Sequence, residues 1–387
     1  MVVNFYRPVE VFFGKGALEK VGEVARRFGF KALIVTGRES ARRSGALDRL
    51  INSLTRYKIE HYLIFNEVMP NPTAGVVNEG ARLAVEEKVD FIVGLGGGSA
   101  LDVAKAISIV SSNEGSAWDY VKYPEGPRLI PYLSRPVICV PTTAGTGSEV
   151  NRFSVITNEV RKEKLVLSHS LNYPKAAFID PSLCLTMSPK LTAITGFDAL
   201  IHALESLTNR VENFMAEEYA VRAVELIARW LPVAVEDPQN LKAREKMSYA
   251  AMLAGVAIDH TGVALIHSME HPVSAHYPHV AHAVGLAALS PYITKFNCKG
   301  NPQKYSLFAR LMGYEEKPHK AVDALTDLIE HLNLPRTLKE LGVEREMLTR
   351  LTEDVYMLSR HSLPINPVEP SIEDIGELYT RAYEGNL

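Results

Sequence analysis

The sequence predicts an α/β Rossmann-like N-terminal domain, residues 1–185, followed by an all-helical C-terminal domain, residues 186–387. Over roughly the first 180 residues, short β-rich runs alternate with amphipathic stretches. Glycine-rich loops follow two of these runs, and helical periodicity dominates from Ser188 onward. Because strands that alternate with helices form parallel sheets covered on both faces, we expect such a sheet in the first domain.

The strands and helices of the two domains are predicted from the period of their apolar residues. Three short runs of β-branched and apolar residues predict buried strands at 31–36, 91–95 and 137–140. Amphipathic periodicity predicts helices at 73–87 and 99–111 in the first domain and, most clearly, at 216–231 and 320–332 in the second.

Composition excludes several classes of protein. The chain has 387 residues, of which 47% are hydrophobic and 22% charged, enough for two domains. A net charge of −3 gives no indication of the basic surface that is typical of nucleic-acid-binding proteins. The N-terminus lacks a signal-peptide pattern, and no apolar run reaches the length of a membrane span. The three cysteines are isolated, so we expect a cytoplasmic protein with buried thiols.

A glycine cluster follows the strand predicted at 91–95. Gly96, Gly97 and Gly98 lead into Ser99 and the next predicted helix. Glycines between a strand and a helix let backbone N–H groups approach a pyrophosphate, and the helix N-terminus favours the negative charge. The cluster is neither GxGxxG nor a Walker A loop, and a simple tight turn is the alternative interpretation.

A second loop of small residues, from Pro141 to Val150, follows the strand predicted at 137–140. Its threonines, serine and glycines offer hydrogen-bond donors at close range. Two such loops at the carboxyl ends of parallel strands fit a dinucleotide crevice. A Ser/Thr-rich turn is the alternative interpretation.

Histidines gather in one short part of the predicted helical domain. Six of the twelve in the chain are His260, His267, His271, His276, His279 and His282. Upstream, Asp198 and His202 are four residues apart, so on a helix both side chains lie on one face. A carboxylate and several imidazoles suit a divalent ion such as Fe2+ or Zn2+.

Prolines decide whether the later histidines can meet. On one continuous helix, His267 and His282 would lie about 22 Å apart, too far to share an ion. We expect Pro272 and Pro278 to break that helix, so that the chain doubles back. His276 and His279 are then ordinary loop residues. Asp198 also has an alternative interpretation, as an acid at a helix N-terminus.

Several long motifs share one resemblance. They are Gly96 to Ser99 with Asp102 and Lys105, Pro141 to Val150, Asp180 to Leu183, Leu191 to Glu205, His267 to Pro272, and Asn366-Pro367. Together they resemble the iron-containing (group III) alcohol dehydrogenases over nearly the whole chain. The resemblance implies a dehydroquinate synthase-like architecture and hydride transfer between a nicotinamide cofactor and a small alcohol or aldehyde.

The resemblance also implies the residues of the site. The metal ligands would be Asp198, His202, His267 and His282. His279 is the rival for the last ligand, because Pro278-His279 imitates the family's Pro-His-Gly motif, whereas Pro291 follows His282 at the family's usual spacing. His271 would relay the hydroxyl proton or only pack beside the site. The cofactor-binding residues would be Gly37, Arg38, Gly96, Gly97, Gly98, Ser99, Asp102, Thr142, Thr143, Thr146, Ser148 and Lys164.

Cofactor, metal and partners are expected as follows. Gly37 stands where NAD-using relatives often carry an acid, and Arg38 follows it with a guanidinium that can pair with a 2′-phosphate. NADP(H) is therefore the expected preference and NAD(H) the alternative. Fe2+ is expected, with Zn2+ as the alternative in a glycerol or polyol dehydrogenase of the same superfamily. A non-enzymatic metal-binding protein fits poorly, because it needs no dinucleotide crevice. A small alcohol or aldehyde is the expected partner, with no nucleic acid or membrane, and a homo-oligomer remains open.

Overall fold

The computed structural model describes residues 2–123, 126–131 and 133–387. Within them the chain packs as two units. The α/β unit contains Tyr6–Met187 together with Gln239–Ser248. The helical unit contains Ser188–Pro238, Tyr249–Leu387 and the N-terminal segment that ends at Phe5. Two short segments therefore pack with the unit formed mainly by a distant part of the chain.

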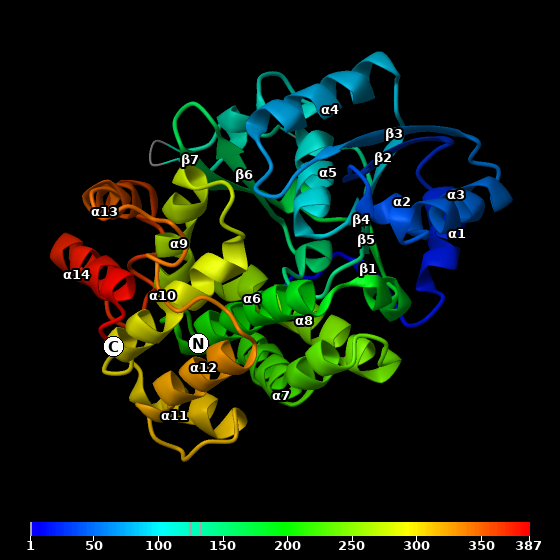
Figure 1. The fold of residues 1–387 in the computed structure, drawn as a ribbon. Coiled ribbons are helices and arrows are strands. Elements are labelled where there is room, and N and C mark those ends of the chain that lie inside the picture. The colour runs from blue at the N-terminus through cyan, green and yellow to red at the C-terminus, as the bar shows by residue number, and fades with distance from the viewer. Residues whose placement is uncertain (1, 124–125, 132) are drawn as a thin grey trace. The chain divides into compact units, whose positions relative to one another are not determined.

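The α/β unit is built on a 6-stranded parallel sheet (Figure 1). In spatial order its strands are β1 (Glu10–Phe13), β8 (Ala176–Ile179), β5 (Val137–Pro141), β4 (Phe91–Gly96), β2 (Lys31–Gly37) and β3 (His61–Val68). The central strands β2, β4 and β5 match the three predicted runs. Their side chains are almost all buried, as expected for strands covered on both faces.

Helices cover both faces of this sheet. Ile34 of β2 and Val93 of β4 belong to one apolar core with Leu50 of α3 (Ala46–Arg56) and with residues of α1 (Val21–Ala25) and α2 (Ser40–Arg43). The next residue of β4, Gly94, points to the opposite face, where an added Cβ would lie 2.9 Å from the Cβ of Ala104 on α5 (Gly98–Val110). The helix α4 (Ala74–Glu86) packs beside α5.

A small antiparallel hairpin, β6 (Phe153–Asn158) and β7 (Glu163–Ser168), completes the strands of the described α/β unit. The sequence did not predict it. Short 3-10 helices connect the elements: η1 (Ala17–Lys20), η2 (Ala117–Tyr120), η3 (Ser148–Val150), η4 (Ser170–Asn172) and η5 (Pro181–Thr186).

The remaining helices begin with α6, which starts at Pro189, directly after its N-cap residue Ser188. The Ser188 side chain accepts a hydrogen bond from the Leu191 N–H, and Pro189 occupies the first turn, where no intrahelical donor is needed. The helices are α6 (Pro189–Thr208), α7 (Phe214–Glu236), α8 (Leu241–Thr261), α9 (Leu265–His276), α10 (His282–Asn297), α11 (Pro302–Leu311), α12 (Lys320–His331), α13 (Met347–Leu358) and α14 (Ile372–Glu384).

The predicted fold class is confirmed: a parallel α/β domain precedes a helical domain. Two local interpretations are wrong. Pro272 lies inside α9 and does not end it, because a proline removes only one intrahelical hydrogen bond and the helix around it is almost wholly buried. The chain reverses later, between His276 and His282. Asp198 lies in the middle of α6, so it is no N-terminal acid.

No single helix of the described residues is long and apolar enough to cross a membrane. The pair α8 and α9 reaches the required length and composition only together, and it is bent by 102° at the break. Cys139 and Cys184 are buried and Cys298 is half-buried, and all three are free thiols.

Candidate functional site

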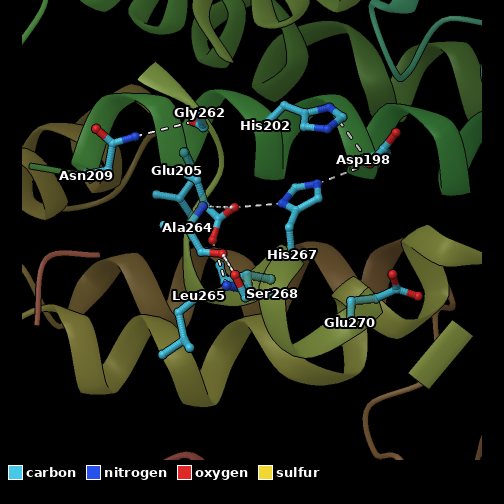
Figure 2. A network of polar contacts seen from close by, with 12 residues as sticks. Asp198, His202, Glu205, Asn209, Gly262, Ala264, Leu265, His267, Ser268 and Glu270 are labelled. Atoms are coloured by element: carbon cyan, nitrogen blue, oxygen red, sulfur yellow. Dashed lines mark hydrogen bonds and ion pairs between the residues drawn. The ribbon is translucent and has the colours of Figure 1, made fainter. Parts of the chain in front are cut away.

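Three helices of the helical unit bring the four expected ligand residues together. Figure 2 shows three of them, Asp198, His202 and His267. Asp198 and His202 come from α6, His267 from α9 and His282 from α10. The Oδ1 atom of Asp198 lies 3.8 Å from His202 Nδ1, 3.9 Å from His267 Nε2 and 3.9 Å from His282 Nε2. Ligand atoms about 2.1 Å from one tetrahedral ion lie about 3.4 Å apart. Asp198, His267 and His282 each offer an atom within 4.8 Å of those offered by the other two, and His202 adds a nitrogen near Asp198.

Two glutamate carboxylates accept hydrogen bonds from the imidazoles of His267 and His282. Glu205 accepts a hydrogen bond from His267 Nδ1 at 2.6 Å (Figure 2). Glu270 accepts one from His282 Nδ1. Each bond occupies the Nδ1 atom and leaves Nε2 directed at Asp198, as carboxylates behind metal-binding histidines commonly do. Neither glutamate was predicted to have a role, although Glu205 lies seven residues after Asp198 on the same face of α6.

Glu205 also holds the start of α9. Its carboxylate accepts hydrogen bonds from the backbone N–H groups of Ala264 at 3.0 Å and Ile266 at 2.6 Å. Asn366, from the Asn-Pro motif near the C-terminus, accepts a bond from the N–H of Leu265 at 3.3 Å. These contacts satisfy N–H groups that an isolated helix N-terminus leaves without partners. They also fix the backbone that carries His267.

The chemistry of the cluster fits a divalent cation. Among the described residues, Asp198 Oδ1 and His267 Nε2 are buried and have no hydrogen-bond partner, which is costly unless another group binds them. Burial raises the pKa of Asp198, but the adjacent imidazoles of His202, His267 and His282 outweigh it and bring the pKa below its usual range. Burial lowers the pKa of His267, yet Glu205 and Asp198 raise it to about 9. The two carboxylates therefore favour positive charge between them.

The other histidines between His260 and His282 lie at different distances from the expected ligand residues. The ring of His271 lies 6.4 Å from that of His267 and 5.6 Å from that of His282, between centroids. His279 is exposed and contacts the Leu341 carbonyl at 3.4 Å. His276 bonds to Asp354 at 2.8 Å, and His260 stacks on Phe5. His282, and not His279, thus lies beside Asp198.

In the α/β unit, the two glycine-rich loops lie against each other. The Thr142 N–H donates to the Gly96 carbonyl at 2.9 Å. A Cβ added to Gly98 would lie 2.4 Å from the Thr146 side chain, so only glycine allows this approach. Gly98 opens α5, and Gly147, with a φ of 61°, turns the second loop. Ser99, Thr142 and Thr143 are half-buried, so backbone and hydroxyl donors converge there.

Gly37 lies at the carboxyl end of β2, next to the first loop at the end of β4. Arg38 follows it, is largely exposed, and pairs with Glu67 at 3.5 Å.

The side chains of Asp102 and Lys164 contact protein groups. Asp102 accepts hydrogen bonds from the Ser148 hydroxyl and, at 2.9 Å, from the Val155 N–H. Lys164, on β7, donates to the Asn71 side chain at 3.0 Å.

A dinucleotide-type α/β unit in one chain with a helical carboxylate–imidazole cluster is typical of metal-dependent dehydrogenases. Residues 8–181 match the family described as iron-containing alcohol dehydrogenase, and residues 192–383 match the C-terminal domain of the same family. The chain belongs to the iron-containing alcohol dehydrogenase family and is an oxidoreductase that acts on alcohols.

Relatives that are named for different substrates are similar to this chain over most of their length. Choline dehydrogenase of Bacillus subtilis is 36% identical, covering 91% of this chain and 88% of that protein. 1,3-Propanediol dehydrogenase of Klebsiella pneumoniae is 35% identical, covering 96% of each. NAD-dependent methanol dehydrogenase of Bacillus methanolicus is 30% identical, covering 98% of this chain and 100% of that protein. The crystal structure of an archaeal halo-thermophilic Red Sea brine pool alcohol dehydrogenase superposes with a TM-score of 0.94 at 35% identity, covering 99% of this chain and all of that one.

Proposed function

We propose that this chain is a metal-dependent alcohol dehydrogenase or aldehyde reductase whose divalent ion is held by Asp198, His202, His267 and His282. The single observation that carries the proposal is the convergence of three imidazole nitrogens within 3.9 Å of Asp198 Oδ1. Family membership favours Fe2+, and Zn2+ accepts the same nitrogen and oxygen donors. When bound, the ion supplies a Lewis acid that polarises the oxygen of the alcohol or aldehyde.

His271 is proposed as the residue that moves the hydroxyl proton. It is half-buried and neighbours both His267 and His282, and its side chain is not among the four proposed ligands. An imidazole near neutral pH can accept and release a proton. The alternative is a packing role beside the metal.

The two glycine-rich loops are proposed to bind the cofactor's pyrophosphate. Gly97, Gly98 and Ser99 would present N–H groups at the start of α5, where the helix dipole favours an anion. The second loop would add the hydroxyl groups of Thr142, Thr143, Thr146 and Ser148. When bound, the nicotinamide accepts or donates the hydride.

NADP(H) is proposed as the preferred cofactor, with NAD(H) as the alternative that relatives support. Gly37 carries no acid to repel a 2′-phosphate, and the largely exposed Arg38 offers a guanidinium beside it. The ion pair of Arg38 with Glu67 opposes this proposal, but at 3.5 Å on the surface it is a weak bond.

The proposed function is tested by metal analysis of anaerobically purified protein, followed by assays of small alcohols and aldehydes with NAD(H) and NADP(H). We expect about one equivalent of iron or zinc, loss of turnover on chelation and recovery on reloading. Turnover that survives complete removal of metal would exclude the proposed role of the ion. A protein that binds metal but no nicotinamide would instead support a non-enzymatic metal-binding function.

A further inference from the structure

A buried lysine on α5, the helix that begins at the first glycine-rich loop (Gly96–Ser99), binds the second glycine-rich loop (Pro141–Val150). Lys105 lies on α5, two turns after Gly98, and its side chain is fully buried. Its Nζ donates to the carbonyl of Ser148 at 2.9 Å, to the side-chain oxygen of Asn151 at 3.3 Å and to the carbonyl of Phe153. These acceptors cover the end of the second loop and the start of β6. One ammonium group therefore holds the whole segment by charge-assisted hydrogen bonds.

Asp102, one turn earlier on the same helix, accepts hydrogen bonds from donors of the same segment. Its two carboxylate oxygens accept bonds from the Ser148 hydroxyl and the Val155 N–H. Asp102 Oδ1 and Lys105 Nζ lie 3.4 Å apart, so the half-buried carboxylate compensates the charge of the buried ammonium group. Ser148 is thus held at both its carbonyl and its hydroxyl by the helix that begins at the first loop.

The spacing of the two loops is sensitive to this attachment. Gly98 and Thr146 are so close that a single added Cβ would clash at 2.4 Å. A donor group on the second loop that moved by 1 Å would leave hydrogen-bond range, since useful N–H···O distances span only about 2.7–3.2 Å. Whatever fixes Ser148 therefore also fixes the donors beside Thr146.

We propose that Asp102 and Lys105 are positioning residues that hold the second cofactor loop against the first, and so set cofactor affinity without touching the cofactor. The proposal rests on the proposed binding of the pyrophosphate by these loops. It assigns Asp102 a different role from the direct contact that the motif implied, because its carboxylate is already occupied by Ser148 and Val155.

The test compares Lys105→Met and Asp102→Asn with a matched control, Arg135→Met. Arg135 is a half-buried cation that, like Lys105, donates to backbone carbonyls, but its partners are Val89 and Ser111, and Ser111 follows the C-terminal end of α5. We expect both test variants to raise the Kd of NADH and NADPH, titrated by fluorescence, and the cofactor KM by about tenfold or more. Metal content and kcat at saturating cofactor should stay within about twofold of wild type. Arg135→Met should lower thermal stability while leaving cofactor Kd unchanged.

Gly98→Val separates failure of this inference from failure of the proposed function. If Gly98→Val raises cofactor Kd while Asp102→Asn and Lys105→Met behave like Arg135→Met, the positioning role is overturned. If Gly98→Val also leaves cofactor Kd unchanged in a folded protein, the loops are not the cofactor site. Should Lys105→Met fail to fold, Asp102→Asn alone decides, because it is nearly isosteric and removes one acceptor.

Discussion

The proposed metal site and the two glycine-rich loops are built by opposite means. The cluster uses side-chain atoms on three buried helices, and carboxylates fix the imidazoles of His267 and His282. The loops use backbone groups that approach closely only because Gly98 has no side chain. A site of the first kind is lost when atoms are deleted, and a site of the second kind is lost when atoms are added. Substitutions that delete or add atoms should therefore affect the two sites differently.

Deleting a ligand should have the largest effect. His282→Ala removes an imidazole 3.9 Å from Asp198 and should abolish metal retention. It should lower kcat/KM about 1,000-fold or more, because a Lewis acid contributes several kcal/mol. His279→Ala is the matched control, since His279 is exposed and away from Asp198. Metal analysis and turnover measure both. The reverse pattern in the two variants would show that His279 is the ligand.

Adding atoms should have the next largest effect. Gly98→Val forces a Cβ into the 2.4 Å gap beside Thr146 and should raise cofactor Kd about 100-fold, with metal content intact. Gly75→Val is the control in the same unit, because the atom nearest to its added Cβ is 3.7 Å away. Fluorescence titration gives the Kd. Equal values for the two variants would remove the first loop from the cofactor site.

Substituting the glutamate that bonds to His267, a proposed ligand, should have a smaller effect. Glu205→Gln keeps the shape of the side chain but loses one of the oxygens that receive N–H groups from His267, Ala264 and Ile266. Metal affinity should fall about 10- to 100-fold, as for other carboxylates behind a metal-binding histidine. Glu225→Gln, an exposed residue on α7, is the control. Competition with a chelator measures the affinity, and an unchanged value would refute the supporting role of Glu205.

Adding an acid beside the cofactor loops should have the smallest effect. Gly37→Asp has room, because the nearest atom to an added Cβ is Ser40 Oγ at 3.4 Å. The carboxylate should repel a 2′-phosphate and shift the kcat/KM ratio about tenfold from NADP+ toward NAD+. Steady-state kinetics with both cofactors measure it. A wild type that strongly favours NAD+, or a ratio that ignores the substitution, would contradict the proposed preference.

Local pattern was enough to predict the central elements of the fold. The strands β2, β4 and β5 and the helices α4, α5, α7 and α12 lie where apolar periodicity predicted them, to within a few residues. Their burial is one-sided or complete, and such burial leaves a readable period in the sequence. The short strands β1 and β8, which pair with each other across the length of the α/β unit's sequence, were not predicted. The β6–β7 hairpin was not predicted either, although its two strands are neighbours in the sequence.

By itself, the sequence determined the fold class, the two glycine-rich loops and a set of candidate metal-ligating residues, because the spacing of glycine, proline, histidine and aspartate indicates the chemistry they can perform. The choice of four ligands among those candidates came from the family resemblance. Tertiary structure decided which of these residues meet. In the folded chain, α9 continues through Pro272 and the chain reverses only after His276. His282, and not His279, therefore lies beside Asp198. Packing also places Glu205 in hydrogen-bond contact with His267, and Lys105 in hydrogen-bond contact with Ser148. Such contacts join residues about 40 or more apart, and packing of whole helices, which no local pattern encodes, brings them together.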